Sequence, residues 1–92
     1  DFDYFLRVKG LSMKDAGIME DDLVAIKKTT EVRNGDIVVA RIGDEVTLKY
    51  FQSSDNQIKL IPANDDFDEI YINKETEEFF IEGKSVGLIR EN

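Results

Sequence analysis

The feature that most constrains the fold is a pair of strand patterns in the middle of the chain, separated by a two-residue turn. Residues 36–42, DIVVARI, form a β-branched and apolar run, which is typical of a strand buried on both faces. Gly43 and Asp44 come next, and residues 45–51, EVTLKYF, then largely alternate between apolar and polar side chains. So short a connection between two strand patterns predicts an antiparallel hairpin.

The rest of the chain also has mostly strand character. Strand patterns are expected at residues 1–8, 23–26, 57–61, 70–72 and 79–90. The last of these contains Gly83 and Gly87, and we expect it to bend at one of them. Residues 12–15, SMKD, are the exception, because a serine followed three residues later by an acid fits a helix start with Ser12 as the N-cap. The pattern predicts an all-β sheet or a partly closed barrel.

Composition excludes several kinds of site. The chain has 92 residues, which suits a single domain, and it contains neither cysteine nor histidine. Disulfides, thiolate catalysis, Ser-His-Asp triads and zinc sites built on these residues are therefore excluded. Acid–base chemistry near neutral pH would need a Lys, Asp, Glu or Tyr with a shifted pKa. The acidic segment 65–69 lacks the spacing of an EF-hand loop, so no metal and no cofactor are predicted.

The charge balance argues against a polyanion partner for this segment. The net charge is −8, and no run of Lys or Arg is longer than Lys27-Lys28, so we do not expect the segment to bind DNA directly. No apolar run approaches the ~20 residues of a membrane span, and no signal peptide is visible. The sequence begins at Asp1 rather than at a methionine. We therefore expect a fragment of a longer protein.

Ser12 and Lys49 are the candidate catalytic residues. A serine hydroxyl needs a base to become a nucleophile, and lysine can be that base only when it is neutral. Burial in an apolar cleft lowers the pKa of a lysine, and Val46, Leu48 and Phe51 lie nearby in the sequence. Judged by local pattern alone, however, Ser12 is more simply a helix cap and Lys49 a solvated residue on a strand.

The order and spacing of several segments resemble the catalytic domain of LexA-type repressors, a family that includes phage repressors and the UmuD mutagenesis proteins. These segments are VKGLSMKDAGIMEDDLVAI, VRNGDIVVARI, DEVTLKYF, IKLIPAN and FIEGKSVGLIR, and they cover nearly all of the chain. The Ser-Met pair after a Gly-X step, followed 37 positions later by the lysine of VTLK, is the most specific part. KDAGI and VRNGDIVVA are more similar to LexA than to UmuD.

The resemblance implies a fold and an activity. The fold is a mostly antiparallel all-β domain with a partly open pseudo-barrel and at most one or two short helical turns, spanning residues 1–92. The activity is self-cleavage by a dyad of Ser12 and Lys49, stimulated by RecA filaments in the bacterial cytoplasm after DNA damage. Thr47 shares a strand face with Lys49 and is expected to orient its amine. The backbone N–H groups of Leu11 or Ser12 are the expected oxyanion donors, Gly10 is expected to permit the bend, and Met13 is a further supporting residue.

The resemblance also implies partners that this segment does not contain. Homodimerisation is expected through the C-terminal strand, at residues Ser85, Val86, Gly87, Leu88, Ile89 and Arg90. DNA binding is expected only through a missing N-terminal domain. The scissile Ala-Gly bond of the family is expected on a missing upstream loop, because Ala16-Gly17 lies too close to Ser12 to enter its own cleft. Two alternatives stay open: a UmuD-like polymerase accessory subunit, and a catalytically silent repressor that only dimerises.

Overall fold

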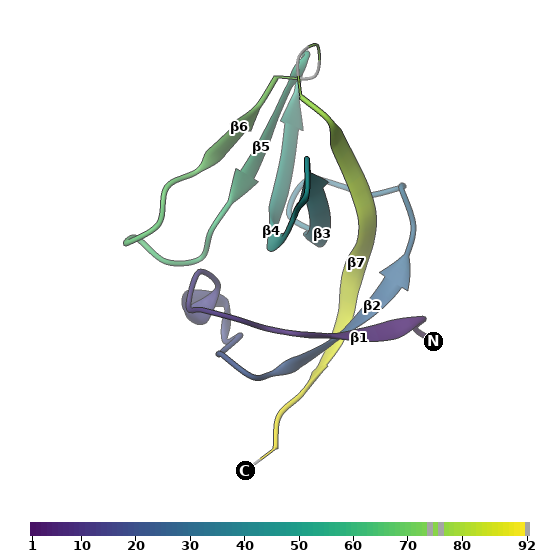
Figure 1. The fold of residues 1–92 in the computed structure, drawn as a ribbon, viewed down its shortest axis with the longest axis vertical. Coiled ribbons are helices and arrows are strands. Elements are labelled where there is room, and N and C mark those ends of the chain that lie inside the picture. Colours follow the sequence, from purple (N-terminus) through teal and green to yellow (C-terminus); the bar gives the residue numbers. More distant parts are fainter. Residues whose placement is uncertain (74, 76, 92) are drawn as a thin grey trace.

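The computed structural model describes residues 1–73, 75 and 77–91, and it consists almost entirely of strands (Figure 1). The elements are β1 (Tyr4–Arg7), the 3₁₀ turn η1 (Lys14–Ala16), β2 (Leu23–Lys28), β3 (Ile37–Ile42), β4 (Glu45–Ser54), β5 (Gln57–Ile61), β6 (Ile70–Ile72) and β7 (Phe79–Ile89). The all-β prediction is confirmed. No helix in this described part of the chain is long and apolar enough to cross a membrane.

The seven strands form one sheet in the order β1-β2-β7-β3-β4-β5-β6, and every neighbouring pair is antiparallel. The predicted hairpin is confirmed as β3 and β4, with Ile42 opposite Glu45 beside the turn. Figure 1 shows that the sheet curls, so that β1 crosses below β4 and β5 instead of running beside them. The sheet is therefore a partly open barrel, and the chain that follows β1 reaches the region where β5 ends.

β3 is buried on both faces, as its sequence predicts. Val38, Val39 and Ala40 have no exposed surface. Val39 packs into one apolar core with residues of β2 and β4, whereas Val38 and Ala40 pack into a second core with residues of β4, β5 and β6. Successive side chains of a strand point to opposite faces, so a run of three apolar residues fills both cores at once.

The long strand β7 bends where its glycines lie. Its pairing with β3 shifts register between the partners Gly83 and Ile81, and its pairing with β2 shifts between Gly87 and Ser85. Each shift leaves one extra residue in β7, which is the geometry of a β-bulge and increases the local bend. The predicted bend is confirmed, and both glycines contribute to it.

Candidate functional site

Ser12 and Lys49, which the sequence separates by 37 positions, meet in the folded chain. Lys49 lies in β4, opposite Val38 of β3, and the residue is only 8% exposed. Its Nζ lies 3.1 Å from the Ser12 hydroxyl oxygen, within hydrogen-bond distance. Nζ also donates to the Thr47 hydroxyl at 2.5 Å, which confirms that Thr47 and Lys49 share a strand face.

The pair borders a cleft of about 330 Å³ between β1 and β4. Most of the surface of the cleft is apolar, although its residues divide equally: Leu6, Val8, Met13, Val46 and Leu48 are apolar, and Arg7, Lys9, Ser12, Thr47 and Lys49 are polar or charged. No carboxylate is among the described residues that line it. Val46 and Leu48 are therefore beside Lys49 as expected. Phe51 is not among the described residues that line the cleft, and it packs into the second core with Val38 and Leu60.

Burial lowers the pKa of Lys49. Desolvation lowers the pKa of its amine below the ordinary value of 10.5, because an ammonium ion loses its hydration in an apolar cleft. A larger fraction of the amine is consequently neutral at a given pH than for a solvated lysine. A neutral amine next to a hydroxyl group is able to accept that hydroxyl's proton.

The backbone around Ser12 is held by the chain just after β5. Ala63 N–H donates to the Ser12 carbonyl oxygen at 2.8 Å, and Asp15 N–H donates to the Ala63 carbonyl oxygen at 2.8 Å. The prediction that Ser12 caps a helix is wrong: η1 begins after Met13, and no side chain caps it. The reason is that the N–H of Asp15 already donates to the Ala63 carbonyl oxygen, while the Ser12 hydroxyl lies beside Lys49.

Two polar side chains that the sequence did not single out complete this support. Asn64, only 7% exposed, donates from Nδ2 to the Leu11 carbonyl oxygen at 2.8 Å. Glu20 accepts the N–H of Gly10 at 3.0 Å. Gly10 has a φ of +78°, in the left-handed region that favours glycine, so the predicted bend before Ser12 is confirmed. The one sequence signal for Asn64 is its place in the segment IPAN.

The backbone N–H groups beside the Ser12 hydroxyl are the candidate donors of an oxyanion site. Among the described residues, none accepts a hydrogen bond from the N–H of Leu11, Ser12 or Met13. The Leu11 side chain is exposed, whereas the Met13 side chain is almost fully buried in the first core. Met13 thus anchors the segment and leaves the backbone beside Ser12 at the cleft.

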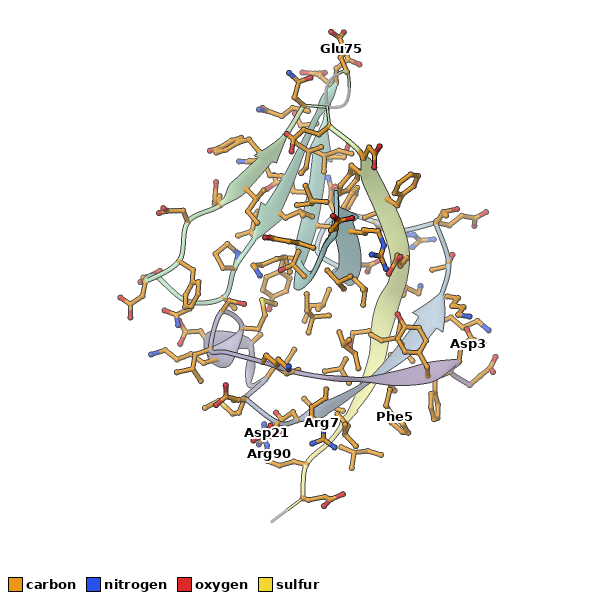
Figure 2. The ribbon with its side chains drawn as sticks, in the orientation of Figure 1. Asp3, Phe5, Arg7, Asp21, Glu75 and Arg90 are labelled. Carbon is orange, nitrogen blue, oxygen red and sulfur yellow. The ribbon has the colours of Figure 1, made fainter. Side chains whose placement is uncertain are left out.

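The end of β7 is exposed, except that Arg90 is held by its own chain. Arg90 donates to both carboxylate oxygens of the buried Asp22, at 2.8 and 2.7 Å, and to the Gly17 carbonyl oxygen at 2.7 Å. Figure 2 shows Arg90 reaching toward the turn that carries Asp21. Hydrogen bonds from Arg90 and from Met19 N–H lower the pKa of the Asp22 carboxyl to about 2. This contact joins the end of β7 to the turn that follows the Ser12 segment.

The remaining residues expected at a dimer interface lie along one open edge. β7 pairs with β2 from Gly83 to Ile89, but its pairing with β3 stops at Lys84. Beyond Lys84, the described residues supply no strand on that side of β7. Val86, Leu88 and Ile89 are between 40% and 48% exposed there.

Comparison with known proteins gives the relationship of this chain. The Peptidase S24-like family matches residues 1–86. The chain is 62% identical to the LexA repressor of Marinomonas sp. (strain MWYL1) over 97% of its own length and 43% of that protein. It is 56% identical to the LexA repressor of Hahella chejuensis and 58% identical to that of Cellvibrio japonicus, covering 96% of this chain in each case. It spans less than half the length of these relatives. With the family pattern extending over nearly all of its length, this chain belongs to the Peptidase S24-like family and is a LexA-type domain.

Proposed function

We propose that this chain is the self-cleavage and dimerisation domain of a LexA-type repressor, with Ser12 as nucleophile and Lys49 as general base. The contact of 3.1 Å between Lys49 Nζ and Ser12 Oγ, inside a cleft that lowers the lysine pKa, is the observation that carries the proposal. A lysine on a solvated strand face would have neither the contact nor the lowered pKa. Membership of a peptidase family supports the same assignment.

The chemistry follows from this arrangement. Neutral Lys49 takes the proton of Ser12 as Oγ attacks the carbonyl carbon of the scissile peptide bond. The negative charge on the resulting tetrahedral oxygen is stabilised by backbone N–H groups beside Ser12. The C–N bond then breaks, and the Lys49 ammonium returns its proton to the departing amine. A water molecule hydrolyses the acyl-serine ester, with Lys49 again as base, while the Thr47 hydroxyl holds the amine in position.

The substrate and the regulator belong to the longer protein. In this proposal the scissile bond is an Ala-Gly step on an upstream linker, RecA filaments stimulate its docking in the cleft, and a separate domain binds the operator DNA. Cleavage then separates the DNA-binding domain from the dimer and releases the repressed genes. The similarity to LexA repressors favours this role over that of a polymerase accessory subunit.

Cleavage of a separate peptide tests the dyad. When the chain is mixed with an extended peptide containing Ala-Gly, we expect hydrolysis whose rate rises with pH, because deprotonation of Lys49 creates the base. The lowered pKa places the midpoint of that rise below 10.5. The rate is measured by chromatography of the products, with Ser12→Ala as the control. A flat profile between pH ~7 and ~10, or equal hydrolysis by the control, contradicts the dyad.

We further propose that two copies pair through the open edge of β7 beyond Lys84. An unpaired strand edge presents free N–H and C=O groups, and its exposed apolar side chains favour a partner that covers them. A second copy offers the same edge in antiparallel orientation, which satisfies both edges by a two-fold axis. The ion pair of Arg90 with Asp22 would hold the end of this strand in place within each protomer.

Sedimentation measures this association. We expect the chain to form a dimer that Val86→Asp weakens at least about tenfold, because two like charges then face the same small interface. Phe67→Asp is the matched control, since Phe67 is 45% exposed and Val86 is 48% exposed, but Phe67 lies outside β7. A monomer at all concentrations, or equal weakening by both substitutions, would overturn the pairing.

A further inference from the structure

We propose that Asn64 is a positioning residue for the reaction, because it fixes which way the peptide group between Leu11 and Ser12 faces. The inference rests on the proposed function of Ser12 and adds a residue to it. Asn64 follows β5 and is 53 positions from Leu11 in sequence, yet its Nδ2 lies 2.8 Å from the Leu11 carbonyl oxygen. This contact is the only one made by the Asn64 side chain to the Ser12 segment among the described residues.

The argument begins with peptide geometry. In a trans peptide the C=O and the N–H point in opposite directions. Asn64 takes the carbonyl of Leu11, so the N–H of Ser12, which belongs to the same peptide group, points away from Asn64. Ala63 takes the carbonyl of Ser12 in the same way, so the N–H of Met13 also points away from this chain segment. Asn64 and Ala63 together orient the N–H groups of Ser12 and Met13 so that both point away from residues 63–64.

Such an arrangement is what a developing oxyanion requires. The N–H groups of Ser12 and Met13 donate to no acceptor within the described residues, so they are available to a substrate oxygen next to Ser12. If the peptide group turned over, the Leu11 carbonyl oxygen would take the place of the Ser12 N–H. A carbonyl dipole there would repel negative charge instead of stabilising it.

The chain before Ser12 makes this turning-over a real alternative. Gly10, with a φ of +78°, and the exposed Leu11 leave the adjacent peptide without support from side-chain packing. The N–H of Lys14 donates to the Leu11 carbonyl oxygen at 3.2 Å. The shorter bond from Asn64, at 2.8 Å, adds a buried amide donor that favours the same orientation. Asn64 is itself held, because its Oδ1 accepts the N–H of Asp66 at 2.9 Å and its side chain is only 7% exposed.

Asn64→Ser tests the inference, with Asn34→Ser as the matched control. A serine hydroxyl can still accept the Asp66 N–H but is too short to reach the Leu11 carbonyl. The amide of Asn34 also binds a distant backbone: Nδ2 donates to the Ser53 carbonyl oxygen at 3.1 Å, and Oδ1 accepts the Ser53 N–H at 2.7 Å. Asn34 does not line the cleft. Both substitutions thus remove a side-chain hydrogen bond to a distant backbone carbonyl, from an exposed residue at Asn34 and from a buried one at Asn64.

Two readouts separate positioning from general stability. In the peptide-cleavage assay we expect the high-pH plateau to fall about 10- to 100-fold for Asn64→Ser, since loss of an aligned oxyanion donor costs up to about 10³-fold. The pH midpoint stays unchanged, because Asn64 does not contact Lys49. Amide hydrogen exchange at Asp15 and Ala63 speeds up, while exchange in β3 does not. Asn34→Ser leaves the plateau and both amides unchanged.

An unchanged plateau together with unchanged exchange in Asn64→Ser overturns the inference, whereas the dyad then still stands. If the wild-type chain cleaves no peptide, the proposed function fails, and exchange at Asp15 and Ala63 alone decides whether Asn64 holds the segment. Should Asn64→Ser not fold, Asn64→Asp replaces it. The aspartate keeps the shape and the acceptor for Asp66 but has no donor for Leu11, and it must also lower the plateau.

Discussion

Lys49→Met is expected to abolish peptide cleavage and, at the same time, to raise the free energy of unfolding at pH ~7. The activity falls by at least about 10³-fold, because no other described group that loses a proton lies in contact with the Ser12 hydroxyl. The stability rises by about 1–2 kcal/mol, because an apolar side chain replaces the charged side chain of a residue that is only 8% exposed and borders a mostly apolar cleft. Peptide hydrolysis and urea unfolding measure the two effects.

The pH dependence of stability gives the same expectation a second test. The amine of Lys49 has a lower pKa in the folded chain than in the unfolded chain, so the unfolded chain binds more protons between the two values. The free energy of unfolding of the wild-type chain therefore increases relative to that of Lys49→Met as the pH rises toward 10.5. Lys59→Met is the control, since Lys59 forms a partly exposed ion pair with Glu69. Retained cleavage, or a stability difference that is constant with pH, contradicts the role of Lys49.

Gly83→Ala is expected to destabilise the fold by about 2–4 kcal/mol, which is a large part of the roughly 5–10 kcal/mol available to a domain of this size. A Cβ atom at Gly83 would lie 2.6 Å from the Lys27 carbonyl oxygen and 2.7 Å from Cγ2 of Ile26. Neither neighbour can move freely, because both belong to β2, which pairs with β7 along its whole length. The cost is measured by urea unfolding.

Gly87→Ala is the matched control for this expectation. It lies in the same strand, but its added Cβ would meet only the Cβ of Ala25, at an ordinary contact distance of 3.8 Å. We expect a change within about 0.5 kcal/mol, because nothing has to shift. Equal losses in the two variants, measured at one protein concentration, would show that the close approach at Gly83 has no special importance.

The sequence alone determined the strands and the register of the central hairpin. DIVVARI predicted a strand buried on both faces. The two-residue turn after it determined the register in which β4 pairs with β3. Alternation along β4 placed Thr47 and Lys49 on one face, which the contact between their side chains confirms. These features follow from side chains that are close in sequence, so local pattern is sufficient to predict them.

For the site, local pattern suggested the wrong environment. It favoured a helix cap for Ser12 and a solvated amine for Lys49, and only the family resemblance brought the two residues together. The structure places them in contact, and Phe51 packs into the second core without lining the cleft. Strand alternation predicts which residues share a face but not what covers each face, so it could not predict the surroundings of Lys49.

Only the tertiary structure identified the groups that hold the Ser12 segment. Asn64 and Ala63 reach it from beyond β5, and Arg90 reaches Asp22 from 68 positions away. An asparagine after a proline, or an arginine near the end of a strand, has the sequence signature of an ordinary turn or surface residue. Their roles depend on how the curled sheet brings distant backbone groups together, because a hydrogen bond is decided by position in space rather than by separation along the chain.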